Sequence, residues 1–344
     1  MNPLACSMFV FSLAVGMTIT MSSHHWLLAW VGLEINTLAI IPLMTKIPHP
    51  RAIEAATKYF LTQATASALI LFSTLINAWK VGEWEISTPL YTPSIVLLIA
   101  IAMKLGMSPM HFWLPEVLQG IPLSSGLILS TWQKIAPMML LIQLPQNTNT
   151  YLTTSIGLAS IFIGGWGGIN QTQMRKIMAF SSIGHLGWMI LILKFNPQLT
   201  QLNFILYLLM TTAMFMSLIP SASMKMLDMS TSWVKTPTLA IFTMFLLLSL
   251  AGLPPMTGFT PKLLISMELI KQNLLTLASL TMMISLLALF FYLRLTYIII
   301  MLISPNTNTS TSSWQTNTKI NPLTSLTNII ALFIFPMTPT LLLM

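Results

Sequence analysis

The chain has 344 residues, of which 55% are hydrophobic and only 6% are charged. Ordinary soluble domains carry about 25% charged residues, so this composition predicts an integral membrane protein without a soluble domain. The net charge of +8 does not indicate a nucleic-acid-binding protein, because no basic cluster is larger than the pair Arg175 and Lys176. With one cysteine, Cys6, and no histidine spacing typical of zinc or haem, the chain is expected to hold no metal and no other cofactor.

Turn residues and charges divide the apolar sequence into eleven candidate membrane spans, each close to the roughly 20 residues that a bilayer requires. The approximate spans are 4–21, 26–44, 52–78, 94–107 with a continuation beyond 115, 124–144, 152–169, 175–193, 202–219, 239–270 with an interruption, 275–303 and 324–343. We therefore expect an all-α polytopic membrane protein.

Two of these spans contain the same kind of interruption. The stretch GMSPMHFWLPE begins at Gly106, the stretch GLPPMTGFTPK begins at Gly252, and the two align without a gap. Besides the glycines, Pro109 and Pro255 occupy equal positions. Non-helical backbone is tolerated at membrane depth only where protein or a water-filled cavity satisfies its polar groups. The paired interruptions therefore predict two broken helices beside an ion path.

Five ionisable residues fall inside or directly beside the expected spans. An ionised group at the bilayer centre costs roughly 2.5 to 3.5 kcal/mol on insertion scales, so each such residue is a functional candidate by default. Side chains that can gain and lose a proton inside a membrane are typical of proton pathways. The candidates for proton transfer are Glu34, Lys104, Lys134, His185 and Lys262.

The candidates also have structural interpretations. Glu34 and Lys104 could form a static ion pair that fixes the register of two helices. His185 could be a neutral packing group, since neutral histidine is tolerated between membrane helices. Glu54 and Lys58 stand four residues apart near the start of a span, in the favourable orientation, and we interpret them as a structural pair.

Helix ends distinguish two of the lysines. Thr260 is expected to cap the resumed half-helix, with Pro261 at its first position. This places Lys262 in a first turn, where the helix macrodipole disfavours a cation, whereas Lys104 lies in a last turn, where the macrodipole favours one. The residue aligned with Lys262 in the first interruption is Glu116, so the two interruptions differ in charge.

Basic residues are distributed unevenly among the loops. The even-numbered connections carry Lys46, Arg51, Arg175, Lys176, Lys225, Lys235 and Lys319. The odd-numbered connections carry only Lys80, Lys194 and Lys271. The positive-inside rule therefore predicts that the N-terminus lies on the cytoplasmic or matrix side and the C-terminus on the opposite side.

Long blocks of sequence surround the five candidates. They are WVGLEINTLAIIPLM around Glu34, MKLGMSPMHFWLPEVLQGIPL around Lys104, LSTWQKIAPM around Lys134, SSIGHLGWM around His185 and LLSLAGLPPMTGFTPK ending at Lys262. These blocks resemble the subunit 2 family of NADH:ubiquinone oxidoreductase (respiratory complex I), in its mitochondrially encoded vertebrate type. The resemblance implies an antiporter-like membrane-arm subunit, in which the five residues line a polar axis for proton transfer.

The resemblance also implies an architecture and a location. It implies a single antiporter-like domain of two inverted five-helix repeats, about 3–145 and about 150–303, each with a broken helix, followed by a C-terminal helix at about 323–344. Family members commonly have fourteen helices, and this chain would lack the first three. The implied location is the mitochondrial inner membrane, with the N-terminus on the matrix side and the C-terminus on the intermembrane-space side.

The implied function is proton translocation coupled to electron transfer from NADH to ubiquinone. Flavin, iron–sulfur clusters and quinone are then expected in other subunits. The implied partners are membrane-arm subunits, with subunit 4 and subunit 4L types as neighbours, accessory subunits, and membrane lipids such as cardiolipin; nucleic acid is not expected. The residues alone leave two alternatives open, a free-standing proton/cation antiporter and a membrane scaffold without a proton path.

Overall fold

The computed structural model describes residues 3–86, 91–144, 149–301 and 322–338, and within these residues the protein is helical apart from two isolated β-bridges. The chain divides into two compact units, Met1–Ala159 and Ser160–Met344. Among the described residues, seven segments are long and apolar enough to cross a membrane, and three shorter helices are also apolar. The all-helical membrane class is therefore confirmed, whereas the count of eleven spans stays a prediction.

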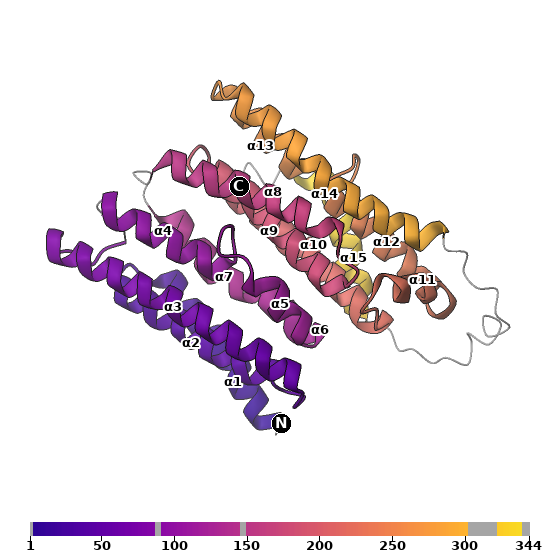
Figure 1. Cartoon of the computed structure of the whole chain (residues 1–344), viewed down its shortest axis with the longest axis horizontal. Helices are drawn as coiled ribbons and strands as arrows, with labels where there is room; N and C mark the ends of the chain where they lie inside the picture. The colour runs from indigo at the N-terminus through magenta and orange to yellow at the C-terminus, as the bar shows by residue number, and fades with distance from the viewer. Residues whose placement is uncertain (1–2, 87–90, 145–148, 302–321, 339–344) are drawn as a thin grey trace. The chain divides into compact units, whose positions relative to one another are not determined.

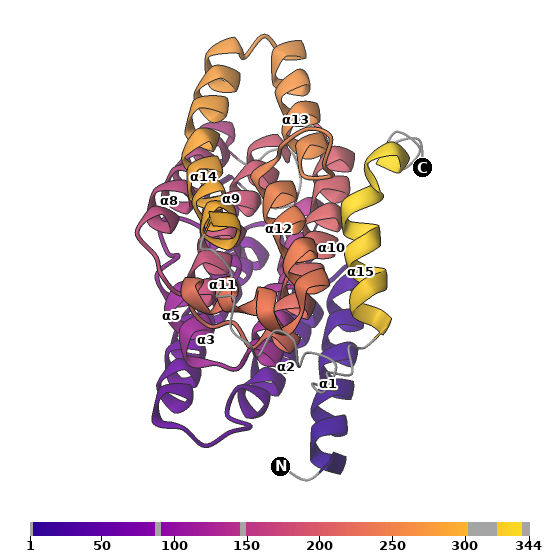
Figure 2. The ribbon, with the colours of Figure 1, turned by 90° about the vertical axis from the view of Figure 1, so that its right-hand side faces the viewer.

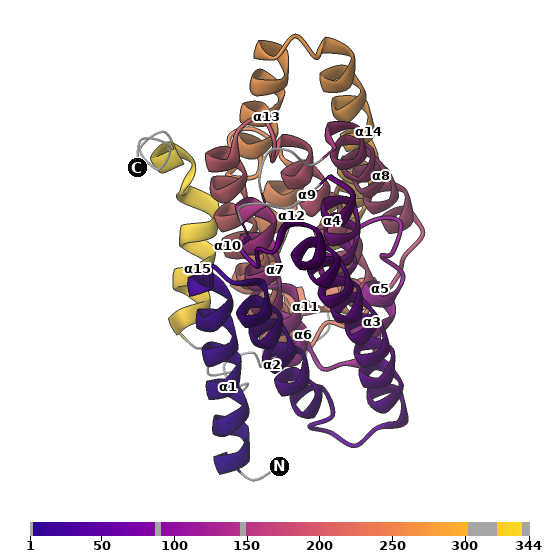
Figure 3. The same cartoon turned by 90° about the vertical axis from the view of Figure 1, so that its left-hand side faces the viewer.

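The first unit is a bundle in which the second helix is central. Its elements are α1 (Pro3–Ser22), α2 (Trp26–Met44), α3 (Pro50–Val81), α4 (Tyr91–Leu105), α5 (Trp113–Gly120), α6 (Leu123–Ser130) and α7 (Trp132–Gln143). Helix α2 packs against α1, α3 and α7, and α3 packs against α4 and α5 (Figure 3). The helices α1 and α2 meet at Gly16, where an added Cβ would lie 2.9 Å from the carbonyl oxygen of Gly32. Only glycine permits this approach.

The second unit holds the second half of α8 and all of the later helices. Its elements are α8 (Thr150–Ile169), α9 (Met174–Ile192), α10 (Pro197–Ser221), α11 (Met226–Lys235), α12 (Pro237–Ala251), α13 (Phe259–Lys271), α14 (Leu275–Met301), α15 (Pro322–Phe333) and a 3-10 turn (Phe335–Met337). Helix α9 is buried along most of its length. Helix α12 packs against α10, α14 and α15 (Figure 2). The helices α8 and α9 meet at Gly164, where an added Cβ would lie 2.6 Å from the backbone nitrogen of Gly184.

The same loop connection occurs in both units. In the first unit a β-bridge between His25 and Glu85 joins the α1–α2 loop to the segment after α3. In the second unit a β-bridge between Gln173 and Lys225 joins the α8–α9 loop to the segment after α10. Each bridge is flanked by two backbone hydrogen bonds of 3.0 to 3.2 Å. Each unit thus ties its first and third interhelical connections together.

Both interruptions predicted from the sequence are present. The first break comprises residues 106–112 between α4 and α5, and the second break comprises residues 252–258 between α12 and α13 (Figure 1). Gly106 and Gly252 have φ angles of 76° and 79°, which L side chains rarely adopt. In each break the glycine N–H donates to the carbonyl three residues earlier, and the next N–H donates to the carbonyl five residues earlier. This is the backbone pattern of a helix that ends on a left-handed glycine.

The helices differ from the expected spans in three places. The span 124–144 is interrupted at Thr131 between α6 and α7; Pro137 in the next turn lacks an N–H and crowds the preceding carbonyls. The short helix α11 was not expected, because its ten residues alternate between polar and apolar and lie outside any long apolar run. The last expected span shortens to α15, which ends before Pro336, and residues 339–344 lie outside the described part.

Candidate functional site

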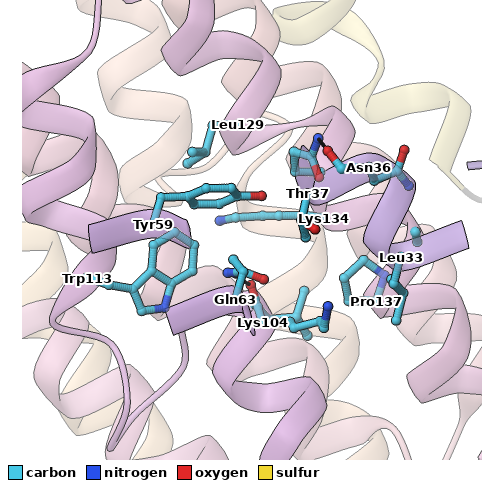
Figure 4. Close-up of a pocket in the computed structure, with 13 residues that line it drawn as sticks. Leu33, Asn36, Thr37, Tyr59, Gln63, Lys104, Trp113, Leu129, Lys134 and Pro137 are labelled. Atoms are coloured by element: carbon cyan, nitrogen blue, oxygen red, sulfur yellow. Dashed lines mark hydrogen bonds between the residues drawn. The ribbon is translucent and has the colours of Figure 1, made fainter. Parts of the chain in front are cut away.

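Two of the predicted residues share a cavity inside the first unit. Lys104 on α4 and Lys134 on α7 line a cavity of about 20 Å³, enough for roughly one water molecule. Tyr59 and Gln63 on α3 and Asn36 on α2 line the same cavity. Figure 4 shows these side chains converging from four helices on one space. The arrangement can support proton exchange, because titratable amines and hydrogen-bonding amides face a space that is closed by apolar side chains.

The end of α4 positions Lys104. The residue is 6% exposed, and its Nζ has no hydrogen-bond partner in the described part of the chain. Its carbonyl accepts a hydrogen bond of 3.3 Å from Nε2 of Gln63, which ties the last turn of α4 to α3. A buried ammonium group without a hydrogen-bond partner is costly. A water molecule or another hydrogen-bond acceptor in the cavity would therefore stabilise Lys104.

The discontinuity between α6 and α7 positions Lys134. The backbone departs from helical geometry at Thr131, whose hydroxyl donates to the carbonyl of Leu127 at 2.7 Å. Lys134 follows within one turn and is 3% exposed. Gln133, beside it, donates from Nε2 to the carbonyl of Asn36 at 3.1 Å and so holds α7 against α2. The side chain of Lys134 therefore points into the bundle and not toward a membrane interface.

Glu34 stands apart from this cavity. It lies on α2, is partly exposed, and its Oε2 accepts a hydrogen bond of 3.2 Å from the hydroxyl of Thr37. It interacts electrostatically with Lys104, but the two make no ion pair within 4.0 Å. The structure therefore lacks the static contact pair that the sequence left open, and Glu34 can act on Lys104 only through its charge.

The other two predicted residues share a cavity inside the second unit. His185 on α9 and Lys262 on α13 line a cavity of about 20 Å³, together with Ser181 on α9 and Tyr292 on α14. His185 is 8% exposed, and its ring centroid lies 5.8 Å from that of Tyr207 on α10. Each unit therefore contains a cavity of similar size that is lined by two of the five predicted residues.

The expected cap at the start of α13 is wrong. The helix begins at Phe259, one residue before Thr260, and the hydroxyl of Thr260 donates to the carbonyl of Thr257 at 2.7 Å instead of capping the helix. Lys262 nevertheless lies in the first turn. Its Nζ reaches back across the second break and donates to the carbonyl of Ala251, the last residue of α12, at 2.5 Å.

This contact reverses the electrostatic argument made from the sequence. The N-terminus of the helix that carries Lys262 disfavours a cation. The four-carbon side chain instead places the ammonium group at the C-terminus of α12, where the macrodipole and an unpaired carbonyl favour a cation. Gly252 makes this path possible, because a Cβ there would lie 2.8 Å from Nζ and 2.9 Å from Cδ of Lys262.

A charged cluster lies at the start of α3. The predicted pair is confirmed, with Lys58 Nζ 2.8 Å from Glu54 Oε1. Lys58 also lies 2.7 Å from Oε2 of Glu116 on α5, a contact that the sequence did not indicate. All three side chains are exposed, so the cluster joins α3 to α5 at the surface and contributes little free energy.

The polar side chains that complete the two cavities were not predicted from the sequence. They are Asn36, Thr37, Tyr59, Gln63 and Gln133 in the first unit and Ser181, Ser285 and Tyr292 in the second. Amides within otherwise apolar spans were the available signal. Among the described residues, no group of three or more His, Cys, Asp or Glu side chains is placed to hold a metal ion.

The sequence matches two family models. Residues 23–288 match the family described as NADH:quinone oxidoreductase/Mrp antiporter, TM, and residues 289–342 match NADH dehydrogenase subunit 2 C-terminus. Together these matches cover residues 23–342, which is all of the described chain apart from α1.

Full-length relatives and solved structures agree with the family match. The chain is 65% identical over 344 residues to NADH-ubiquinone oxidoreductase chain 2 of Aquarana catesbeiana, covering all of both chains. It is 56% identical to the protein of the same name from Xenopus laevis, over 98% of this chain and 99% of that protein. A chain in the structure of respiratory complex I from Thermus thermophilus with bound aureothin superposes with a TM-score of 0.83 at 25% identity, over 98% of this chain and 80% of that chain. The Mrp complex from Dietzia shares the fold, with a TM-score of 0.78 at 17% identity, over 85% of this chain and 60% of that chain.

Proposed function

Because this chain belongs to the NADH:quinone oxidoreductase/Mrp antiporter family, we propose that it is a proton-translocating membrane subunit of NADH:ubiquinone oxidoreductase. The observation that carries this proposal is the pair of enclosed cavities, each holding two ionisable side chains within an apolar helical bundle. Electron transfer from NADH to ubiquinone takes place in other subunits, and these hold the flavin, the iron–sulfur clusters and the quinone.

Five residues take part in proton transfer in this proposal. Lys104 and Lys134 exchange protons through the first cavity, and Glu34 modulates Lys104 electrostatically. His185 and Lys262 exchange protons through the second cavity. Support comes from their place inside apolar helices, because ionisable side chains there are rare and typically mark proton relays.

The two units correspond to the two inverted five-helix repeats, within one antiporter-like domain of about eleven spans. Supporting this layout, each unit repeats the β-bridge between its first and third connections and a glycine contact between its first two helices. Each unit also contains one break with the same backbone hydrogen bonds. Helix α15 lies outside both repeats.

The chain crosses the mitochondrial inner membrane several times, with the N-terminus on the matrix side and the C-terminus on the intermembrane-space side. The distribution of lysine and arginine among the loops supports this orientation, although Lys319 lies outside the described residues. The partners are the other membrane-arm subunits, with subunit 4 and subunit 4L types adjacent, accessory subunits, and lipids such as cardiolipin. The name of the Thermus complex, in which a similar chain is found, supports such an assembly.

The test compares a buried lysine with an exposed one. Lys134→Gln removes the titratable group from the first cavity, whereas Lys80→Gln removes a positive charge from the exposed end of α3. Protons translocated per NADH oxidised are measured in vesicles with matched amounts of assembled enzyme, after native electrophoresis in mild detergent. We expect Lys134→Gln to lose most translocation and Lys80→Gln to keep it. Normal translocation by Lys134→Gln would favour a scaffold, and migration of the wild-type chain in a small oligomer would favour an antiporter.

A further inference from the structure

Helix α15 has one apolar, exposed face and one face that carries buried polar side chains. Its outward face is apolar and exposed, with Leu323, Leu326, Ile329 and Phe333. Its inward face packs against α10 and α12 and includes Thr324 and Asn328, which are buried. Polar groups on the protein side of a helix have to find hydrogen-bond partners there. This pattern indicates that α15 contacts something polar in the second unit.

The length of α15 supports the same conclusion. The helix has 12 residues, which corresponds to about 18 Å, whereas the hydrocarbon core of a bilayer is about 30 Å thick. The helix ends at Phe333, before a 3-10 turn that contains Pro336. Its last carbonyl groups cannot all be satisfied within the helix, so they require partners from elsewhere in the protein.

One of these carbonyls is satisfied by the second break. The hydroxyl of Thr257 donates to the carbonyl of Ala331 at 2.6 Å, and both residues are fully buried. Asn328, one turn earlier on the same face of α15, is 3% exposed, and its Oδ1 has no hydrogen-bond partner among the described residues. Figure 2 shows α15 beside α10 and α12 in the second unit.

Thr257 connects this contact to Lys262. The carbonyl of Thr257 accepts hydrogen bonds from both the N–H and the hydroxyl of Thr260, which together form the first turn of α13. Lys262 follows two residues later and closes the break by donating to the carbonyl of Ala251. Hydrogen bonds therefore link α15 to Thr257 and Thr257 to the start of α13, and the first turn of α13 carries the lysine that is bonded to the end of α12.

We propose that α15 holds the second break in place and that Thr257 is the positioning residue through which it sets the location of the Lys262 ammonium group. Helix α15, which lies outside both repeats, then affects the second break without taking part in proton transfer itself. This inference rests on the proposed role of Lys262 in proton transfer. It goes beyond that role because it assigns a task to α15 and to a side chain that does not titrate.

The test uses threonine variants of the assembled complex. Thr257→Val keeps the shape of the side chain and removes its hydroxyl, Thr257→Ser restores the hydroxyl, and Thr257→Ala removes it without adding an apolar methyl group at the oxygen position. Thr243→Val is the matched control, because the buried hydroxyl of Thr243 donates only to the carbonyl of Ala240 in its own helix, at 2.8 Å. The readouts are hydrogen exchange of the backbone amides in residues 252–262 and protons translocated per NADH.

We expect amide exchange in residues 252–262 to be about tenfold faster in Thr257→Val and Thr257→Ala, the factor that corresponds to roughly 1.4 kcal/mol for one buried hydrogen bond. Proton translocation should fall about twofold or more, and Thr257→Ser should restore both readouts. Exchange equal to that of Thr243→Val would overturn the proposal, and so would faster exchange with unchanged translocation or a lack of rescue by serine. Failure of the proposed function would give a different result. Normal translocation after direct replacement of Lys262 would contradict the proposed function, whatever the rate of amide exchange.

Discussion

The two breaks share a backbone conformation but differ in the side chain that donates to the end of the preceding half-helix. Each begins with a left-handed glycine and repeats the same backbone hydrogen bonds, and Pro109 and Pro255 both follow cis peptide bonds. In the first break the indole Nε1 of Trp113 donates to the carbonyl of Met103 near the end of α4, at 3.1 Å. In the second break an ammonium group occupies the comparable place, because Lys262 donates to the end of α12.

The backbone of the break, which both units share, is structural. The side chain that donates to the end of the preceding half-helix differs between the units and is the candidate for function. A helix interrupted inside a membrane exposes carbonyl groups that some donor has to satisfy. An indole N–H does not release its proton under physiological conditions, so the carbonyl of Met103 keeps this hydrogen-bond donor permanently. An ammonium group can release a proton, and the neutral amine that remains donates more weakly, so the strength of the contact at the second break depends on the protonation state of Lys262.

The largest effect is expected from Lys262→Arg. An arginine keeps a positive charge and more donors, but its guanidinium group stays protonated at any accessible pH. We expect the variant to assemble at near-normal levels and to lose most proton translocation, approaching Lys262→Ala. The measurement is proton uptake per NADH oxidised in vesicles with equal amounts of enzyme. Normal pumping by the arginine variant would make Lys262 a fixed charge, and the two breaks would then be functionally alike.

Glu116, the residue that aligns with Lys262, lies in the first turn of α5 and supplies the control for Lys262. Glu116 is exposed and pairs with Lys58 on the surface. Exposed ion pairs contribute little, typically 1 kcal/mol or less, so Glu116→Gln should change assembly and pumping only slightly. A loss of pumping as large as that of Lys262→Arg would show that the first break takes part in proton transfer at its surface end.

The next largest effect separates backbone strain from the position of the lysine. Alanine at Gly106 or Gly252 forces a side chain into the left-handed region, which costs roughly 1 to 2 kcal/mol. At Gly106 the new Cβ would meet Leu114 at 3.0 Å, whereas at Gly252 it would displace Lys262. We therefore expect both variants to lower the melting temperature of the complex similarly and only Gly252→Ala to reduce proton translocation markedly.

A third glycine isolates the strain. Gly82 after α3 has a φ of 81° and nothing within 4 Å of an added Cβ, so Gly82→Ala reports backbone strain alone. It should lower thermal stability by a similar or smaller amount and leave pumping unchanged. Equal losses of pumping in Gly106→Ala and Gly252→Ala would contradict the distinction between the two breaks.

A smaller effect is expected from the coupling between Glu34 and Lys104. In the first unit the carboxylate of Glu34 acts on Lys104 through its charge, without direct contact. In the second unit Lys262 donates a hydrogen bond to a backbone carbonyl. We expect Glu34→Gln and Lys104→Gln together to reduce assembly yield less than the sum of the single changes. The coupling should stay below the 3 to 5 kcal/mol typical of breaking a buried contact pair. Strict additivity, as expected for Glu34→Gln combined with Lys80→Gln, would mean that the two residues do not interact.

The smallest effect is expected from Trp113→Phe. This change removes the indole N–H from the carbonyl of Met103 and keeps most of the aromatic packing against Tyr59. The loss of one neutral hydrogen bond corresponds to about 0.5 to 1.5 kcal/mol, so a small decrease in melting temperature is expected. Proton translocation should not change, and a strong pumping defect would show that the cover of the first break is also functional.

The sequence by itself determined the membrane class, the two breaks and the burial of three of the five predicted residues, Lys104, Lys134 and His185. These features follow from local rules: apolar runs longer than about 20 residues cross a bilayer, glycine tolerates positive φ, and proline ends a helix. The pair of Glu54 and Lys58 was also accessible, because residues four apart on one helix are neighbours.

Only the tertiary structure decided which residues meet. It grouped Lys104 with Lys134 and His185 with Lys262, kept Glu34 out of contact with Lys104, and turned the Lys262 side chain onto the neighbouring half-helix. It also joined Thr257 to Ala331, 74 residues apart in the chain. Such contacts depend on how helices cross and on where a flexible side chain finds an unpaired carbonyl, and neither is encoded in the spacing of residues along one helix.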